Sequence, residues 1–383
     1  MKSQINFLLL AMLFVTYAHD LRSQHSHFSH ASAKHIRLST GIDMYYREIG
    51  KPGNEEMIML HGVTDTSWSF RSTVDSLLTL FPDLHIIIPD LRGHGRSSMP
   101  SPEHCAADPA ACFEISDFAA DLIAFMDQAN IKKAHLVGHS LGSMVAQVAA
   151  LEHPERVNSV TLISTSTDLR NNPVVQYLYN EVVMGMWKKV LERKIDFQWP
   201  RDAYVLTPLD VDVNAEEWMA ANWAADPTAV PQFIKPIAAD AARVRLGTWY
   251  GFFRAIQTFN TTQALEDISV PTLVLWARQD NMFFEDPDQK KLCTALARAG
   301  RNNQIPYFFK AYGKLPLPDS HNQENDYGHN LQWGAPQGVA SDLASFIRTG
   351  KPTSDLYYAD PQHLTAQRVD PGQAAIITND ASQ

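Results

Sequence analysis

The 383-residue sequence has few cysteines, no excess of positive charge and no internal repeat. Three cysteines are too few for a disulfide scaffold. Lys and Arg number 32 against 42 Asp and Glu, and the resulting net charge of -10 argues against nucleic-acid binding, which normally needs a basic face. Charged residues make up only 19% of the chain, whereas hydrophobic residues make up 45%. This composition provides a large core and excludes disorder as the dominant state.

Long apolar runs are also scarce, and the one near the start is short. Lys2 precedes an apolar run from Ile5 to Tyr17, which small residues follow. We expect residues 1–18 to be a signal peptide, because the run is shorter than the ~20 residues of a membrane-spanning helix. A buried core helix is the alternative. The signal predicts a secreted or periplasmic protein, with no stable membrane insertion after its removal.

Residues 19–33 are expected to be a polar linker. They contain three histidines among serines, which raises a metal-binding tract as an alternative. The linker is favoured because no cysteine or carboxylate completes a ligand set. The histidines are His25, His27 and His30.

Two of the three cysteines, Cys105 and Cys112, lie seven positions apart in a loop-like stretch. An oxidising destination allows a disulfide between them, but the spacing alone is equally compatible with two buried thiols. Cys293 lies in a helical pattern and is expected to be a small core residue.

The body of the chain alternates apolar strand patterns with amphipathic helix patterns. The run at His85–Asp90 is an unbroken β-branched series, typical of a strand covered on both faces. Residues 115–131 place apolar side chains at three- and four-residue spacings, as in a helix that packs on a sheet. The alternation predicts an α/β fold with a mostly parallel central sheet flanked by helices. Further strands are expected at 134–138, 159–164, 270–280 and 305–312.

The alternation stops between residues 168 and 266, a stretch rich in aromatic residues with helical patterns and no clear strand. We interpret it as an inserted helical cap. The core is then expected to comprise residues 34–167 and 267–349, and residues 350–383 a turn-rich tail.

The strongest motif is Gly138-His139-Ser140-Leu141-Gly142, between a strand pattern and a helix pattern. This is the context of a nucleophile elbow, in which a sharp turn exposes a serine at the start of a helix. The Leu141 N–H and the helix dipole would stabilise negative charge developing on a substrate oxygen.

Two upstream segments accompany this motif: His61-Gly62-Val63 after one strand, and the run from Pro89 to Ser97 after the next. With them, residues 34–349 resemble the α/β-hydrolase superfamily, in particular its serine esterase and lipase-like branch with a helical cap. The resemblance implies that Val63 and Leu141 supply the two oxyanion-hole amides. It implies structural or loop-ordering roles for His61 and His94.

The resemblance also implies a catalytic triad in the chain order nucleophile, acid, base. Asp280 follows a strand 140 positions after Ser140 and is the preferred acid, with Asp168 as the alternative. His329, within Tyr327–Leu331, matches the family's base. It comes 49 residues after Asp280, because we expect an insertion before it, and this leaves His321 as a rival.

The residues and the resemblance together predict a serine hydrolase of small to medium carboxylic esters or lactones, acting through an acyl-enzyme. Its partners would be the ester and water, and the mechanism requires no metal or organic cofactor. A carbon–carbon bond hydrolase with the same triad and a non-catalytic ligand-binding protein are the alternatives. Epoxide and haloalkane hydrolases are disfavoured because they need an aspartate in place of Ser140. Some tryptophans of the insertion are expected to line the pocket, from the set Trp187, Trp199, Trp218, Trp223 and Trp249.

Overall fold

The computed structural model describes residues 26–223, 226, 231–313 and 327–353, and two short strands beyond them. An eight-stranded sheet forms its centre, in the order β1-β2-β4-β3-β5-β6-β7-β8. β2 pairs antiparallel with β1 and with β4, and every other neighbouring pair is parallel. The prediction of a mostly parallel α/β sheet is therefore confirmed. The strands are β1 (Ser32–Arg37), β2 (Asp43–Ile49), β3 (Glu55–Leu60), β4 (Leu84–Pro89), β5 (Ala134–His139), β6 (Val157–Ile163), β7 (Thr272–Ala277) and β8 (Tyr307–Tyr312).

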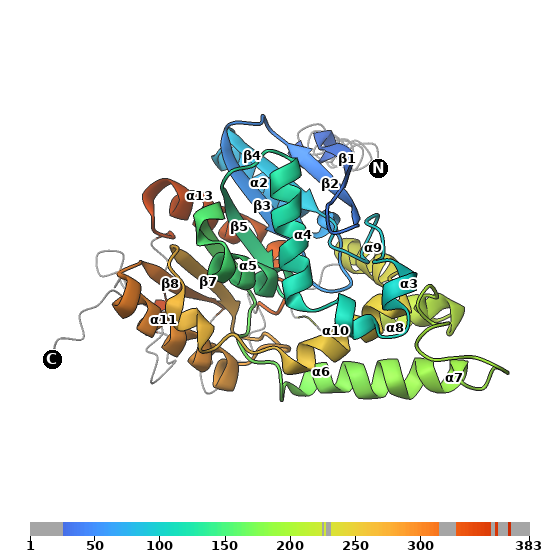
Figure 1. Ribbon diagram of the computed structural model, residues 1–383. Coiled ribbons are helices and arrows are strands. Elements are labelled where there is room, and N and C mark those ends of the chain that lie inside the picture. Colours follow the sequence, from blue (N-terminus) through green and yellow to red (C-terminus); the bar gives the residue numbers. More distant parts are fainter. Residues whose placement is uncertain are drawn as a thin grey trace, which may run out of the picture.

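Helices cover both faces of this sheet, because its strands carry apolar side chains on both sides. In β3, Ile58 and Leu60 join one core cluster, while Met57 and Met59 join the other, as the twofold period of a strand requires. The first cluster includes α4 (Ile115–Gln128), α5 (Leu141–Glu152) and α11 (Lys290–Asn303). The second includes α2 (Arg71–Leu80) and α13 (Pro336–Thr349), which pack against each other (Figure 1).

Helices fill the segment between β6 and β7, which we call the insertion. They are α6 (Pro173–Tyr177), the π-helix η5 (Leu178–Lys188), α7 (Lys189–Leu191), η6 (Pro208–Asp210), α8 (Ala215–Trp223), α9 (Pro231–Ala241), α10 (Leu246–Ala255), η7 (Ile256–Thr258) and η8 (Ala264–Asp267). One long continuous helix, formed by α6, η5 and α7, projects from the body of the molecule (Figure 1). Buried aromatic residues such as Trp187, Trp249 and Phe253 hold the insertion together.

Short elements complete the described chain: η1 (His27–His30), η2 (Ser67–Phe70), α3 (Pro102–Cys105), η3 (Pro109–Cys112), η4 (Pro154–Arg156), η9 (Glu285–Gln289), α12 (Leu331–Gly334), β9 (Tyr357–Tyr358) and β10 (Gln367–Arg368). Cys105 and Cys112 form a disulfide that joins α3 to η3, with their Cα atoms 5.9 Å apart. Of the two alternatives from the sequence, the disulfide is therefore confirmed. Cys293 is buried and unpaired, as expected.

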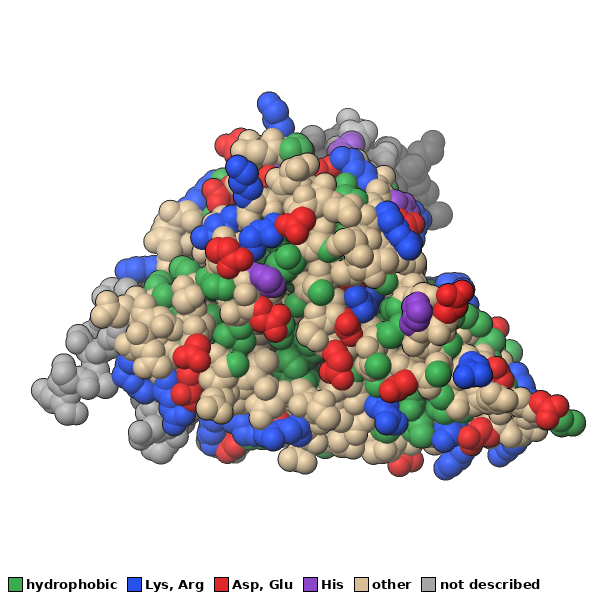
Figure 2. Space-filling view, in the orientation of Figure 1, with side chains coloured by type: hydrophobic (Ala, Val, Ile, Leu, Met, Phe, Trp, Pro, Cys, Tyr) green, Lys and Arg blue, Asp and Glu red, His purple; other side chains and the backbone are tan. Residues whose placement is uncertain are grey.

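Acidic and basic side chains are interspersed over the face of the molecule shown in Figure 2. Among the described residues, no helix combines the length and apolar character that crossing a bilayer requires. The predicted signal peptide at 1–18, His25 and the rival base His321 lie outside the described residues.

Candidate active site

Ser140 occupies the turn between β5 and α5 in a strained backbone conformation. Its φ and ψ are 51° and -116°, an unfavourable region for a residue with a side chain. The turn is tight enough to require glycine on both sides of the serine. A Cβ atom on Gly138 would lie 2.2 Å from the carbonyl oxygen of Gly142, and one on Gly142 would lie 2.1 Å from that of Leu60. The sequence motif thus forms the predicted elbow.

Two main-chain amides beside the serine have no acceptor. The N–H groups of Val63 and Leu141 donate no hydrogen bond to any described residue. The Gly142 N–H donates to the His61 carbonyl oxygen at 3.1 Å, which fixes the loop after β3 against the start of α5. Gly62 lets that loop approach, since a Cβ there would lie 2.9 Å from His139 Nδ1 and 3.3 Å from the Ser140 Cβ. The arrangement can therefore accept negative charge next to the serine.

The two upstream histidines order the loops beneath this site. His61 lies between the Gly62 carbonyl oxygen, 2.7 Å from Nδ1, and the Leu91 N–H, 2.9 Å from Nε2. His94 Nδ1 lies 2.8 Å from the Arg92 carbonyl oxygen. Burial lowers the pKa of His61 to about 4 and that of His94 to about 3, so both rings are neutral near pH 7. These contacts match the structural roles that the resemblance implies.

His329 lines the cavity described below, and Asp280, which does not, contacts its ring. His329 Nδ1 lies 2.9 Å from Asp280 Oδ1, which also accepts hydrogen bonds from the main-chain N–H groups of Met282 and Phe283 at 2.9 and 3.0 Å. A carboxylate only accepts hydrogen bonds, so Nδ1 carries the proton and Nε2 of the neutral ring is free to take one.

The charge of Asp280 controls the protonation of this ring. Burial works to lower the pKa of His329, but the attraction and hydrogen bond of Asp280 outweigh it, with a smaller contribution from Asp226. The net effect is a pKa above the usual 6.5. A buried imidazole that keeps its basicity is suited to general-base catalysis near neutral pH.

Ser140 and His329 line the same cavity, yet no direct hydrogen bond joins their side chains in the described structure. Catalytic hydrogen bonds are often long in unliganded enzymes and tighten when substrate binds. The rival acid Asp168 lies elsewhere: it accepts hydrogen bonds from Arg170 and Lys291, both at 2.8 Å, and is absent from the cavity lining. Asp280 is thus the carboxylate that contacts His329.

A second histidine, His139, supports the first, and no local sequence pattern indicates this role. Its Nε2–H donates to the His329 carbonyl oxygen at 3.0 Å, while its Nδ1 accepts from the Gln332 amide at 3.2 Å. Burial and the nearby charge of His329 hold the pKa of His139 well below its usual value. His139 is therefore a neutral positioning residue for the loop that carries His329.

The insertion reaches the same loop through Asp226. Its Oδ2 accepts hydrogen bonds from the main-chain N–H and the side-chain amide of Asn330, both at 2.9 Å. The two residues are 104 positions apart in the sequence, so no local pattern marks their contact.

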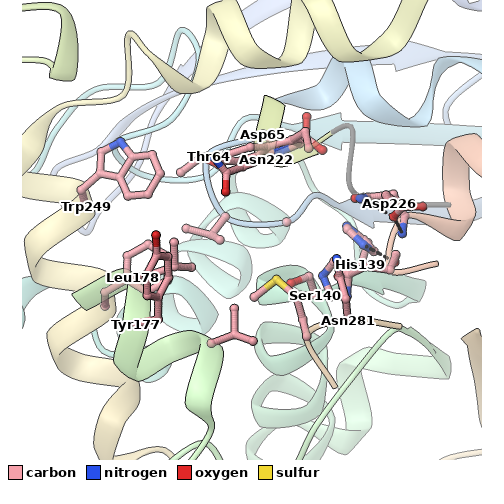
Figure 3. Close-up of a pocket in the computed structure, with 18 residues that line it drawn as sticks. Thr64, Asp65, His139, Ser140, Tyr177, Leu178, Asn222, Asp226, Trp249 and Asn281 are labelled. Atoms are coloured by element: carbon pink, nitrogen blue, oxygen red, sulfur yellow. Dashed lines mark hydrogen bonds between the residues drawn. The ribbon is translucent and has the colours of Figure 1, made fainter. Parts of the chain in front are cut away.

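A cavity of about 320 Å³ opens between the serine turn and the insertion. Figure 3 shows Ser140, His139 and Asn281 on one side of it, and Trp249, Tyr177 and Leu178 from the insertion on the other. Thr64, Asp65 and Asn222 line a third, polar edge. Of the five tryptophans noted in the insertion, Trp223 and Trp249 line the cavity. No lysine or arginine is among the described residues that line it.

Comparison with known proteins agrees with this geometry. The sequence profile of the family described as "alpha/beta hydrolase fold" matches residues 56–336. An epoxide hydrolase of Caballeronia sordidicola is 32% identical over 81% of this chain and 92% of that protein. Epoxide hydrolase A of Mycobacterium tuberculosis is 30% identical over 33% of this chain, and the match spans only 36% of its own length. A crystal structure of a hydrolase from Pseudomonas aeruginosa shares the fold, with a TM-score of 0.61 and 19% identity over 83% of this chain and 99% of that one.

Proposed function

The chain belongs to the α/β hydrolase fold family and is a hydrolase, and from that premise we propose that it cleaves carboxylic esters or lactones of small to medium size through Ser140. One observation carries the proposal. A strained serine and a histidine that is hydrogen-bonded to a buried aspartate line one cavity, next to two main-chain amides without acceptors.

The proposed reaction has two halves. His329 Nε2 takes the proton of Ser140 as its oxygen attacks the ester carbonyl, and the Val63 and Leu141 amides stabilise the oxyanion. Collapse of this intermediate expels the alcohol, which receives the proton from His329. Water, deprotonated by the same ring, then cleaves the acyl-serine and releases the acid. Asp280 stabilises the imidazolium ion in both halves.

Epoxide hydrolysis is the activity named for two relatives, but the nucleophile of this chain argues against it. A carboxylate that opens an epoxide forms an ester, which water can cleave at its carbonyl carbon. A serine that opens an epoxide would form an ether, which has no carbonyl carbon for water to attack. Since Ser140 stands at the nucleophile position, an acyl group is the substrate that allows turnover.

The cavity lining argues against the alternative function, hydrolysis of carbon–carbon bonds. Ring-cleavage products carry carboxylates, which proteins usually bind with arginine or lysine. The described lining has neither cation and includes the carboxyl groups of Asp65 and Asp226. Asp65 is buried, and this burial raises the pKa of its carboxyl group to about 7. These features favour an uncharged ester.

We also propose that the enzyme acts in an oxidising compartment outside the cytoplasm. The disulfide between Cys105 and Cys112 supports this location, because disulfides persist mainly in such compartments. The signal peptide predicted at residues 1–18 leads to the same expectation.

A substrate panel tests the proposed reaction. We expect hydrolysis of p-nitrophenyl butyrate, with a loss of several orders of magnitude in Ser140→Ala and an unchanged melting temperature. Styrene oxide and an anionic dienoate from catechol ring cleavage serve as the competing substrates. Turnover of either at a higher kcat/KM than every ester and lactone tested would overturn the proposal.

A further inference from the structure

A second cavity lies between the core and the insertion, outside the candidate active site. Its volume is about 640 Å³. The segment Thr64–Trp68 separates the two cavities: Thr64 and Asp65 line the first, and Thr66, Ser67 and Trp68 line the second. Four arginines line the second cavity, two from the core and two from the insertion. The cavity therefore has a local concentration of positive charge, although the net charge of the chain is -10.

The core supplies Arg47 from β2 and Arg96 from the loop after β4. Both guanidinium groups lie over the Tyr45 ring, at 5.9 and 5.2 Å from its centroid, and Arg47 also lies 5.0 Å from the centroid of Phe28. A contact with an aromatic face orients a guanidinium without using its N–H donors. Neither side chain has an acceptor within hydrogen-bonding distance among the described residues, and Arg47 Nε is buried.

The insertion supplies Arg243 and Arg245, which lie between α9 and α10. Arg243 donates to the Ala239 carbonyl oxygen at 2.5 Å and forms an ion pair with Glu216 at 3.9 Å. Arg245 donates to the Val205 carbonyl oxygen at 2.6 Å. Each guanidinium has five N–H donors, so both keep donors to spare.

The two carboxyl groups in the lining have partners of their own. Asp90 accepts hydrogen bonds from the main-chain N–H groups of Ser67 at 2.7 Å and Arg96 at 2.9 Å. Asp240 accepts one from the Thr66 hydroxyl at 3.3 Å. No ion pair within 4.0 Å joins either carboxylate to the four arginines among the described residues. The lining thus carries four cations against two acids, and among the cations only Arg243 has an ion-pair partner, Glu216, in the described part of the chain.

We propose that this cavity binds a small anion with two negative charges on oxygen, a phosphate monoester or a dicarboxylate, held by Arg47 and Arg96 from the core and by Arg243 and Arg245 from the insertion. Arginine is suited to this ligand because its planar N–H pairs match two oxygens at once. The cavity has room for an organic group beside the anion. The bound anion offsets repulsion between the arginines of the two parts and links them.

Binding can be measured by isothermal titration calorimetry on the full chain, with phenyl phosphate and malonate as probes and sodium chloride at matched ionic strength as the control. We expect one saturable site for at least one probe. Arg47→Gln and Arg96→Gln should each weaken binding about tenfold, because each removes a charge-assisted donor. Arg301→Gln, which removes one exposed positive charge on α11, is the matched control and should bind like the wild type.

Two checks separate this proposal from the proposed function. Circular dichroism and p-nitrophenyl butyrate hydrolysis show whether the arginine variants remain folded, and Ser140→Ala should bind the probe with unchanged affinity. The site is supported if the dianions bind more tightly than chloride and if this binding is weakened in Arg47→Gln and in Arg96→Gln but not in Arg301→Gln. Absence of saturable binding, or equal binding by all three arginine variants, overturns it whether or not the enzyme cleaves esters.

Discussion

At the scale of single residues, the proposed chemistry depends on the protonation of one imidazole. His329 is buried, and burial alone would lower its pKa and make it a weak base. Asp280 reverses this effect through a 2.9 Å hydrogen bond and its negative charge. His139 holds the His329 main chain, and Asp226 holds the next residue, Asn330. The ring is thus fixed from the core and from the insertion.

The pH dependence of kcat/KM follows from these contacts. The reaction needs neutral His329, so the rate should fall as the pH drops through a pKa raised above 6.5. In Asp280→Asn the carboxylate is gone and burial dominates, so the acid limb of the profile should move to lower pH. The maximal rate should fall by several orders of magnitude, because the amide favours the wrong tautomer.

Asp288→Asn is the matched control for this measurement. Asp288 accepts hydrogen bonds from Ser166 and from the Phe284 N–H, at 2.7 and 2.8 Å, and makes none to His329. Its substitution should move the acid limb far less. An unmoved limb in Asp280→Asn would show that another group controls the profile.

The sequence identified those residues whose roles are marked by local patterns. The glycines around Ser140 are required by the turn itself, and Asp280 directly follows the stretch that contains β7. His139 lies within the same motif as Ser140, but its partner Gln332 is 193 positions away. Asp226 likewise meets Asn330 only through the folded insertion. Such contacts depend on tertiary packing, which no local pattern encodes.

At the scale of elements, the loop closed by the Cys105–Cys112 disulfide packs against a helix that lines the cavity. The helix η3, which ends at Cys112, packs on α10, and a Cβ on Gly251 of α10 would lie 2.9 Å from the Pro109 carbonyl oxygen. α10 carries Trp249 and Phe253 into the cavity lining. The fixed loop therefore supports the insertion side of the candidate active site.

Replacing both cysteines with serine should lower the free energy of unfolding by about 2 to 3 kcal/mol, from the loop-closure entropy of so short a loop. Urea denaturation of the oxidised wild type and the double variant measures the difference. The single variant Cys293→Ser is a control for loss of a buried thiol alone. A double variant as stable as the wild type would mean that the loop is held by its other contacts, such as those of Arg92 with the Cys112 carbonyl oxygen and Asp121.

The elements themselves were predictable where their periodicity was strong. The unbroken apolar run in β4 and the amphipathic stripe of α4 agree with the structure. The π-helical form of η5 was not predicted, since the same residues match an ordinary helix pattern. The start of β8 falls at Tyr307 rather than Ile305, because element ends depend on capping and pairing partners.

At the scale of the whole molecule, the candidate active site lies between the carboxyl end of the central strand β5 and the insertion. The sheet side supplies Ser140 and His329, and the insertion supplies the apolar wall that includes Leu178 and Trp249. Substrate size should therefore depend on the insertion, while the chemistry depends on the core.

Leu178 offers a test of this division. It is partly buried and projects from η5 into the cavity. Leu178→Trp should reduce kcat/KM for p-nitrophenyl octanoate about tenfold relative to the acetate, because the indole occupies cavity volume. Leu178→Ala should change the ratio in the opposite direction. If the kcat/KM for the octanoate divided by that for the acetate is the same in both variants, the substrate binds away from this wall.

Covalent labelling of the nucleophile tests the proposed catalysis most directly. The full chain is incubated with a fluorophosphonate, digested and mapped by mass spectrometry while residual esterase activity is followed. We predict one label per chain, on Ser140, that appears at the rate at which activity is lost and is absent from Ser140→Ala. Activity that persists in fully labelled protein, or loss of activity with the label on another residue, would contradict the role of Ser140.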